Sequence, residues 1–510
     1  MNERTPAVKM RNITKRFAGK VVANDRVWLD IYRGEILALL GENGSGKTTL
    51  MNMLSGIYFP DEGTISIDDK EVVISSPKVA FDHGIGMVHQ HFKLVDVLTA
   101  AENIVLGLEG KLDLKAASEK IKEICDAYGF DVDPNEKIYN MSVSQKQTVE
   151  IVKVLYRGAD ILILDEPTAV LTPQETDKLF AVLRNMRDAG KAIVIITHKL
   201  HEVQDLSDRV AILRKGQFVG DVITSTTTPE EMTNMMVGRP VILNIERPEP
   251  VDPKNRIEVR NLTVKSIDGI TKLDDVSFDI RSGEILGIAG ISGCGQKELL
   301  ESIAGLQKTE SGTITYIEDN GEREELLGKD PLKIEEMGVT LSFVPEDRLG
   351  MGLVGSMDLS DNMMLRSFRR GKSLFTDRKS PHELAEKVVE ELGVVTPSIS
   401  TPVGRLSGGN VQKVLVGREI AEAPSVLLTA YAVRGLDVNS SYTIYDLLNQ
   451  QKKRGVGVVY VGEDLDVLLE LADRILVLCA GKVSGIVEGR KTNKREVGMM
   501  MTKLGGKADE

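Results

Sequence analysis

The sequence of 510 residues predicts an α/β fold that is built twice, as two tandem domains in one chain. Two observations lead to this prediction. Apolar, β-branched runs such as "EILALL", "ILILD" and "AIVIIT" alternate with helical stretches, which is typical of a largely buried sheet covered by helices. Segments of the same kind then return in the same order in the second half of the chain.

The internal repeat keeps its register over long distances. The segment "VKMRNITK" from Val8 matches "IEVRNLTV" from Ile257, an offset of 257 − 8 = 249 residues. Further along, "SDRVAILRKG" from Ser207 matches "ADRILVLCAG" from Ala472, an offset of 472 − 207 = 265 residues. The second half therefore contains a duplicated domain with an insertion of 265 − 249 = 16 residues.

This repeat defines the expected domain boundaries. We expect the first domain at residues 5–240 and the second at residues 257–505. Residues 241–256 lie within "PVILNIERPEPVDPKNR", whose four prolines predict a stiff, extended linker. In the first domain, a mostly helical insert that includes "KAASEKIKEICDAYGF" lies between a glycine-rich loop and the strand "ILILD".

The composition narrows the class of protein. It is that of a globular protein, with 42% hydrophobic and 27% charged residues. No apolar run approaches the ~18 residues that a membrane helix needs, so a membrane role would require separate subunits. The net charge of −12 argues against nucleic acid as the main partner. The three cysteines have no metal-binding spacing and suit a reducing cytosol.

The first domain carries a phosphate-binding loop, "GENGSGKT", after a predicted strand and before a predicted helix. Its glycines let backbone N–H groups close on phosphates, and the helix N-terminus adds positive potential. We expect Lys47 to reach the β- and γ-phosphates and the Thr48 hydroxyl to bind Mg²⁺. The predicted nucleotide-binding residues here are Gly41, Glu42, Asn43, Gly44, Ser45, Gly46, Lys47, Thr48 and Thr49.

Two carboxylates follow the apolar run "ILIL". Asp165 ends the predicted strand, where it can hold Mg²⁺ directly or through bound water, and Glu166 can orient and deprotonate an attacking water. Such a pair is more often a simple strand end. Here Lys47 of the phosphate-binding loop lies 165 − 47 = 118 residues upstream, which favours a functional role.

Three further residues complete the predicted site. Gln90, in "MVHQHF", follows a strand-like run and is expected to contact the magnesium and the attacking water. His198, in "IITH", could donate to the γ-phosphate, although a lone histidine at a strand end is more often structural. Phe17 could stack on adenine, and a core aromatic at a strand end is nearly as common.

Taken in order, the loop, Gln90, "MSVSQKQ", "ILILDEP" and His198 resemble the motifs of ABC-family ATPases over nearly the whole chain. Two such domains, the second degraded, resemble the importers of simple sugars and nucleosides. The stretches "GMVHQHFKL", "LYRGADILILDEPTAVLTPQE" and "FVPEDRLGMGLV" are most similar to the branch associated with purine-nucleoside uptake.

The resemblance implies two tandem P-loop NTPase domains. Each would have a RecA-like α/β core, an antiparallel β subdomain and a helical subdomain. It also implies ATP and Mg²⁺ as cofactors, integral-membrane permease subunits as partners and, indirectly, an extracytoplasmic substrate-binding protein. The chain would then lie peripherally on the cytoplasmic face of the cell membrane.

The second copy has lost the charged groups of the first. The offsets give its equivalents of Lys47, Thr48, Asp165, Glu166, His198 and Phe17 as Gln296, Lys297, Ala430, Tyr431, Glu463 and Ser266, and Gln90 corresponds to Glu346 in "FVPEDR". Lys297 does not restore the loop, because one position along a helix turns a side chain by about 100°. Each charged hydrogen bond is worth about 1.5–3 kcal/mol, so we expect Mg-ATP binding at least about a hundredfold weaker and no hydrolysis.

One feature is better kept in the second copy. The stretch "LSGGN" matches the signature of the resembled family, and its Ser407, Gly408 and Gly409 would form a helix N-terminus that grips a γ-phosphate. The first copy has "MSVSQ", where Val143 hinders close backbone approach. Asp437 is also kept, whereas its first-copy equivalent is Thr172.

The resemblance implies head-to-tail pairing of the two domains. One composite site would then join Lys47, Asp165 and Glu166 to the second-domain signature and Asp437, while the other would join two degraded halves. The leading hypothesis is the ATP-hydrolysing subunit of a nucleoside importer, and an importer of simple sugars such as ribose or galactose is the alternative.

Docking to a permease is expected through the helical insert and residues 90–106 and 346–365. A soluble twin-ABC protein acting on ribosomes is a further hypothesis. Such proteins usually keep both sites intact and separate their domains by a long charged linker, which this chain lacks.

Overall fold

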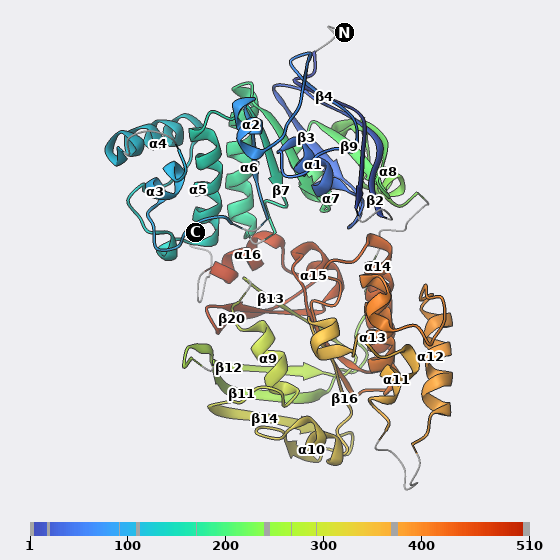
Figure 1. The fold of residues 1–510 in the computed structure, drawn as a ribbon. Helices are drawn as coiled ribbons and strands as arrows, with labels where there is room; N and C mark the ends of the chain where they lie inside the picture. Colours follow the sequence, from blue (N-terminus) through green and yellow to red (C-terminus); the bar gives the residue numbers. More distant parts are fainter. Residues whose placement is uncertain are drawn as a thin grey trace. The chain divides into compact units, whose positions relative to one another are not determined.

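The computed structural model forms two compact units, Met1–Ile242 and Leu243–Glu510. Each unit contains a six-stranded sheet, a four-stranded antiparallel sheet and a group of helices (Figure 1). The structure describes residues 5–17, 21–90, 92–108, 113–169, 171–238, 245–266, 268–291, 293–368 and 376–502. Of the predicted linker at residues 241–256, residues 241–244 lie outside the described residues, as do residues 503–505 of the predicted second domain.

The six-stranded sheet of the first unit has the order β10-β9-β3-β8-β7-β6, and only β9 and β10 are antiparallel. Every residue of β3, β7 and β8 is buried, which explains why these strands are apolar except at one end of each. The strands are β3 (Glu35–Leu40), β6 (Ile85–Val88), β7 (Ile161–Asp165), β8 (Ala192–Thr197), β9 (Arg209–Arg214) and β10 (Gln217–Ile223).

The four-stranded sheet of the first unit packs around helix α1 (Lys47–Leu54). Its order is β2-β1-β4-β5, with β1 (Val8–Phe17), β2 (Val21–Ile31), β4 (Glu62–Ile67) and β5 (Lys70–Val72). A separate helical group consists of α3 (Ala100–Val105), α4 (Leu114–Tyr128) and α5 (Val143–Tyr156) (Figure 1). The remaining helices are α2 (Pro77–Asp82), α6 (Pro173–Asp188), α7 (Leu200–Leu206) and α8 (Pro229–Val237).

The second unit repeats this architecture. Its six-stranded sheet has the order β16-β17-β18-β13-β19-β20, and its antiparallel sheet has the order β12-β11-β14-β15. The strands are β11 (Asn255–Lys265), β12 (Thr271–Arg281), β13 (Ile285–Gly290), β14 (Ser311–Ile317), β15 (Arg323–Glu325), β16 (Leu341–Val344), β17 (Val426–Ala430), β18 (Gly457–Val461), β19 (Arg474–Cys479) and β20 (Lys482–Glu488).

Helices of the second unit also correspond to those of the first. The helical group consists of α11 (Leu359–Met364), α12 (Lys379–Glu391) and α13 (Gly408–Ala421). The others are α9 (Gln296–Ile303), α10 (Pro331–Glu336), α14 (Val438–Lys453), α15 (Leu465–Leu471) and α16 (Lys494–Thr502). The predicted pair of tandem α/β domains is confirmed. Along the part of the chain that the structure describes, no helix combines the length and apolarity needed to cross a membrane.

An aspartate anchors the central strand of each unit at its start. In the first unit, Asp208 accepts a hydrogen bond from the backbone N–H of Ile36 in β3 at 2.8 Å and pairs with Arg187 at 3.1 Å. In the second unit, Asp473 accepts from β13 at 2.8 Å and pairs with Lys452 at 2.7 Å. The second pair is buried: the Lys452 side chain is 1% exposed, compared with 25% for Arg187.

We expect Lys452→Met to destabilise the second unit by about 3 kcal/mol, because it leaves the Asp473 carboxylate buried without its cation. The matched change Arg187→Met should lower stability by about 1 kcal/mol or less, because water screens that pair. Differential scanning calorimetry of the full chain measures both effects. Equal shifts of the two variants would contradict the assigned difference in burial.

Candidate functional site

Backbone geometry shapes the loop between β3 and α1. Gly46 has φ 95°, and a Cβ there would lie 2.2 Å from the carbonyl oxygen of Ala23. A Cβ at Gly41 would lie 2.3 Å from the carbonyl oxygen of Leu213. Neither position accepts a side chain, so glycine is required at both. The loop therefore closes tightly on the first turn of α1.

Lys47 spans this loop from inside. It is buried, and its Nζ donates to the carbonyl oxygens of Gly41 at 2.6 Å and Glu42 at 3.0 Å. Burial lowers the pKa of the Lys47 ammonium, while the charges of Glu166, Asp165 and Glu42 raise it. The carboxylates thus support a cation at a buried position.

The same loop has an unused hydroxyl. The Ser45 Oγ is buried, and among the described residues it has no hydrogen-bond partner. An orphaned donor, a buried ammonium and the N-terminus of α1 converge on one concave loop, which fits the phosphates of a nucleotide. The residues present therefore fit ATP as predicted.

Asp165 ends β7 next to the loop, because β3, β8 and β7 are parallel neighbours. It is buried, and this burial raises the pKa of its carboxyl to about 6, with a further contribution from Glu166. Thr48 Oγ1 lies 3.5 Å from Asp165 Oδ1 and opposes this rise. A hydroxyl and a carboxylate so placed are oxygen donors of the kind that Mg²⁺ prefers.

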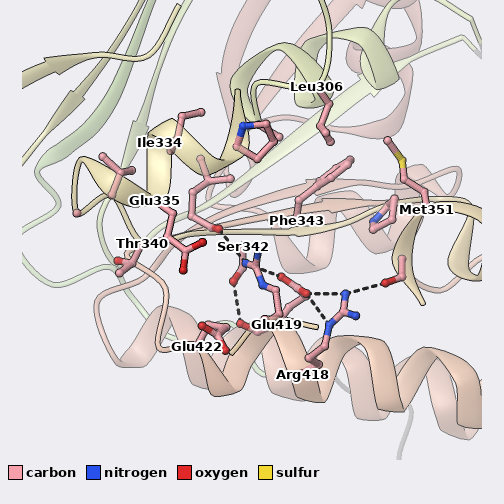
Figure 2. A pocket seen from close by; sticks show the side chains of 18 residues that line it. Leu306, Ile334, Glu335, Thr340, Ser342, Phe343, Met351, Arg418, Glu419 and Glu422 are labelled. Atoms are coloured by element: carbon pink, nitrogen blue, oxygen red, sulfur yellow. Dashed lines mark hydrogen bonds and ion pairs between the residues drawn. The ribbon is translucent and has the colours of Figure 1, made fainter. Parts of the chain in front are cut away.

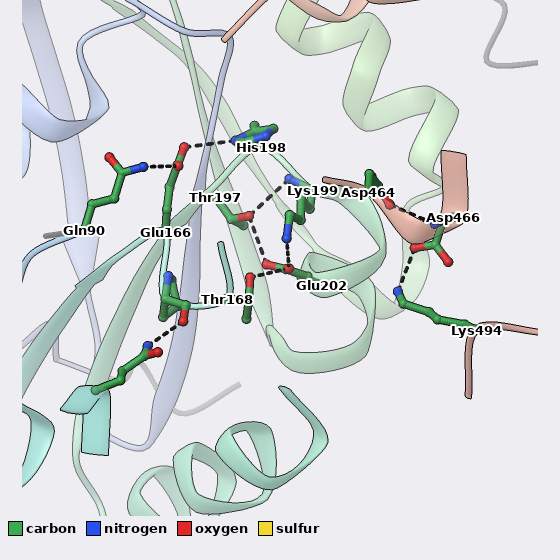
Figure 3. A network of polar contacts seen from close by, with 12 residues as sticks. Gln90, Glu166, Thr168, Thr197, His198, Lys199, Glu202, Asp464, Asp466 and Lys494 are labelled. Carbon is green, nitrogen blue, oxygen red and sulfur yellow. Dashed lines mark hydrogen bonds and ion pairs between the residues drawn. The ribbon is translucent and has the colours of Figure 1, made fainter. Parts of the chain in front are cut away.

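Glu166 is the centre of a network of polar contacts (Figure 3). Its Oε2 accepts from Gln90 Nε2 at 3.0 Å, and its Oε1 lies 3.0 Å from His198 Nδ1. The hydrogen bond from His198 lowers the pKa of the Glu166 carboxyl, against the effect of burial. The structure thus brings together Gln90, Glu166 and His198, which lie far apart in the sequence. A carboxylate held ionised in this way can accept a proton.

Figure 3 also shows a second carboxylate, Glu202, which was not among the predicted site residues. Glu202, buried on α7, accepts from the hydroxyls of Thr197 at 3.1 Å and of Thr168, and pairs with Lys199 at 3.1 Å. These partners flank His198 and the turn after Glu166, so Glu202 fixes the backbone on both sides of the network. An acidic residue on an otherwise apolar helix face was the only available hint.

Phe17 is half-buried at the end of β1. Its ring packs against Tyr58 in an edge-on geometry with 5.2 Å between centroids, and Lys15 Nζ lies 5.6 Å from its centre. These contacts leave its stacking on adenine a prediction.

The equivalent loop of the second unit keeps its shape without its charge. Gly295 has φ 99°, and Gln296 is buried with its Nε2 donating to the carbonyl oxygen of Ile291 at 3.1 Å. The Gln296 Oε1 is buried, and it has no partner among the described residues. Lys297 is exposed, with its Nζ 3.8 Å from Glu301. The Gln296 oxygen, a hydrogen-bond acceptor, stands where the first unit has the Lys47 ammonium, so this loop does not favour binding of phosphate.

The turn after β17 repeats the turn that carries Glu166. Tyr431 has φ 50°, close to the 47° of Glu166, and burial raises the pKa of its hydroxyl to about 12. Around it, Arg434 pairs with Glu346 and, at 3.0 Å, with Glu463. A neutral phenol stands where the first unit has the Glu166 carboxylate, so this position offers no base at neutral pH.

The signature segment of the second unit packs on the start of α14. A Cβ at Gly409 would lie 2.9 Å from Ser440 Oγ and 3.2 Å from Asp437 Oδ2. Asp437 caps α14 by accepting from the Ser440 backbone at 2.8 Å and hydroxyl at 2.7 Å. Ser407 Oγ accepts from Asn410 Nδ2 at 2.9 Å and makes no capping bond to its own helix.

The first-unit counterpart differs in its serine. The Ser142 hydroxyl accepts from the Gln145 backbone at 3.2 Å, in a capping box that the Gln145 side chain completes. That hydroxyl is therefore engaged by its own helix, as expected for a cap. The two signature segments thus differ in hydrogen bonding as well as in sequence.

Comparison with known proteins places this loop and its carboxylates in a family. The model of the ABC transporter family matches residues 25–169 and 273–429. Over 99% of both chains, 42% of residues are identical to those of a nucleoside import ATP-binding protein of Lactococcus lactis. A guanosine import ATP-binding protein of Bacillus subtilis is 41% identical over 98% of this chain and 99% of its own.

A third relative, a glucose import ATP-binding protein of Haloferax volcanii, is 40% identical over 98% of this chain and 96% of its own length. The chain belongs to the ABC transporter family, with one family domain in each unit. It is an ATP-binding transport ATPase.

We expect Glu166→Gln to lower the rate of ATP hydrolysis about 10²- to 10⁴-fold, because the amide cannot accept the proton of the attacking water. ATP binding should persist, because Lys47 and the loop are unchanged. Phosphate release and nucleotide binding, measured on the same preparation, separate the two effects. Gln296→Ala is the matched control in the second unit and should leave turnover unchanged. Wild-type turnover in Glu166→Gln would remove Glu166 from the mechanism.

Proposed function

We propose that this protein is the ATP-hydrolysing, energy-coupling subunit of an importer for nucleosides. Its first unit would hydrolyse ATP, and its partners would be integral-membrane permease subunits. Its class as the ATP-binding subunit of an ABC importer follows from relatives that match it over nearly its full length. Nucleoside cargo is supported by the printed functions of the two relatives at 42% and 41% identity. The 40% identity to a glucose import protein supports simple sugars as the second candidate.

We assign a single composite ATP site to the protein. The first unit would supply the buried Lys47 and the carboxylates Asp165 and Glu166, and the second would supply a signature with two glycines and Ser407, whose hydroxyl makes no capping bond to its own helix. Each unit lacks what the other has. The observation that supports this assignment best is that the losses are complementary, because two independent sites would each need a full set.

In this mechanism the chain's own residues bind, orient and move a proton. Bound Mg-ATP would supply the phosphoryl group that is transferred to water. Lys47 and the α1 N-terminus would hold the β- and γ-phosphates, and Thr48 and Asp165 would hold the metal. Gln90 and His198 would orient Glu166, which takes the proton from the attacking water. Ser407, Gly408 and Gly409 would stabilise charge on the γ-phosphate across the interface.

Docking of a permease is assigned to the helical groups and the segments beside them. The second unit has a cavity of ≈ 380 Å³ along the edge strand β16 (Figure 2). Apolar side chains that include Phe343 and Met351 line it, together with the carboxylates of Glu335 and Glu422. Met351 belongs to the predicted docking segment 346–365. Its apolar side chains would accept the apolar face of a permease helix. Of the predicted segment 90–106, residue 91 lies outside the described residues.

The composite site predicts an asymmetric response to matched substitutions. We expect Gly409→Val to reduce ATP hydrolysis by about tenfold or more, because its side chain would enter the space within 2.9 Å of Ser440 Oγ and block backbone approach to phosphate. The equivalent change Ser144→Val, at 409 − 265 = 144, should leave hydrolysis nearly unchanged.

In the Glu166→Gln background, equilibrium dialysis should count one tightly bound ATP per chain. Full activity of Gly409→Val, or two ATP of similar affinity, would refute the composite site.

The transport function is tested by isolating the tagged Glu166→Gln chain from detergent-solubilised membranes. We expect a polytopic permease to accompany it, and the reconstituted assembly to take up purine nucleosides in an ATP-dependent manner. Competition with ribose, galactose and glucose distinguishes the second candidate cargo. Recovery with ribosomal proteins and without a permease would overturn the importer assignment.

A further inference from the structure

The second unit has a charged cluster where the first has its catalytic carboxylate. The Arg434 guanidinium pairs with Glu346 and, at 3.0 Å from its Nε, with Glu463. These two glutamates occupy the positions of Gln90 and His198, which both bind Glu166 in the first unit. Two groups that converge on an anion in one unit therefore converge on a cation in the other.

The first unit has no arginine at the position that corresponds to Arg434. The offset of 265 places Ala169 at the position of Arg434, since 434 − 265 = 169. Arg348 lies two residues after Glu346, and the equivalent position in the first unit, two residues after Gln90, is Phe92. Both arginines are thus specific to the unit with the intact signature.

The cluster reaches the signature segment through two routes. On one side, Arg348 donates to the backbone carbonyl of Arg434, and its Nη1 lies 3.2 Å from the point where a Cβ of Gly408 would be. On the other side, the turn that carries Arg434 runs into Asp437, whose Oδ2 lies 3.2 Å from the Cβ point of Gly409. The two glycines of the signature therefore lie beside two segments of chain, which the hydrogen bond from Arg348 to the Arg434 carbonyl joins.

This arrangement gives the second unit a contact that does not depend on a nucleotide. In the first unit, Gln90 connects the sheet edge to Glu166, and a bound ligand can change that connection. In the second unit, the carboxylates of Glu346 and Glu463 already pair with the guanidinium of Arg434, which is part of the chain itself. Each exposed ion pair alone contributes little to stability. Here, however, the two pairs share the guanidinium of Arg434, and the backbone carbonyl of Arg434 also accepts a hydrogen bond from Arg348.

We propose that Arg434 is a positioning residue that holds the signature segment 407–409, and the helical group α11–α13 with it, in one orientation whether or not ATP is bound. This inference rests on the proposed composite site for its effect on turnover. The second unit then acts as a fixed platform, and only the helical group of the first unit changes orientation with ATP.

Distances within each unit test the fixed orientation by itself. The full-length Glu166→Gln chain, with its three native cysteines replaced by alanine, is spin-labelled at Lys308→Cys and Glu390→Cys in the second unit. A parallel sample is labelled at Lys70→Cys and Glu123→Cys in the first unit. We expect ATP to shift the first-unit distance and to leave the second-unit distance unchanged. A second-unit shift as large as that of the first unit would overturn the proposal.

Arg434→Ala then tests which residue holds the platform. We expect it to broaden the second-unit distance distribution and, in the chain with Glu166 intact, to lower kcat about three- to tenfold, as expected for loss of a shared ion-pair network. Arg434→Lys should restore most of kcat. Arg323→Ala is the matched control, because Arg323 pairs with Glu258 and is 54% exposed, as is Arg434. An unchanged distribution in Arg434→Ala would overturn the proposal.

The two proposals fail in different ways. If Gly409→Val abolishes turnover while Arg434→Ala changes neither distance nor kcat, the composite site stands and the positioning role is wrong. If Arg434→Ala broadens the distance and Gly409→Val keeps full activity, Arg434 holds the signature but the composite site is wrong.

Discussion

The candidate site of the first unit depends on one backbone hydrogen bond, from the N–H of Glu166 to the carbonyl oxygen of Ile196 at 2.9 Å. This bond bends the chain directly after β7 and holds Glu166 at φ 47°, a left-handed conformation that costs about 1–3 kcal/mol for a residue with a side chain. The bend turns the carboxylate toward Gln90 and His198, while Asp165 one residue earlier remains beside Thr48. Two adjacent carboxylates thereby take different partners and have pKa values shifted in opposite directions.

The second unit shows that the same bend forms without a carboxylate at this position. The N–H of Tyr431 donates to the carbonyl oxygen of Val461 at the same 2.9 Å, although no carboxylate follows β17. The strained turn therefore survives wherever the parallel strands pair, and side chains alone decide whether it is catalytic. Its neighbours differ as a set: Glu346 and Glu463 pair with Arg434, whereas Gln90 and His198 bind Glu166.

The sequence predicted most of the fold because sterics and periodicity leave a local record. The phosphate-binding loop could be recognised by its glycines, because a Cβ at Gly41 or Gly46 would collide with a neighbouring strand. The convergence of Gln90, Glu166 and His198 was predictable because parallel strands end at one edge of a sheet. Contacts made by single buried polar side chains left no such record, as the Glu202 network demonstrates.

The chain before β11 gives a similar lesson. The prolines of residues 241–256 predicted an extended linker, and regular secondary structure is absent from its described residues 245–254. Yet Arg247 donates to the carbonyl oxygen of Leu469 at 2.9 Å, and Lys452 donates to that of Pro248. This part of the chain is therefore bound to residues that lie more than 200 positions away in sequence, which no local pattern predicts.

Electrostatics links the losses in the second loop to one another. Lys47 is buried, and its ammonium is supported by Glu42, Asp165 and Glu166. The equivalents of these three acids are Ile291, Ala430 and Tyr431, none of which carries a charge at neutral pH. A lysine at position 296 would be a buried cation without counterions, which destabilises a protein by several kcal/mol. Gln296 avoids that charge and still donates to the carbonyl oxygen of Ile291, so the loop keeps its shape. Once the carboxylates are absent, a neutral residue is the more stable choice at this position. The lysine and the acids are therefore lost as a set.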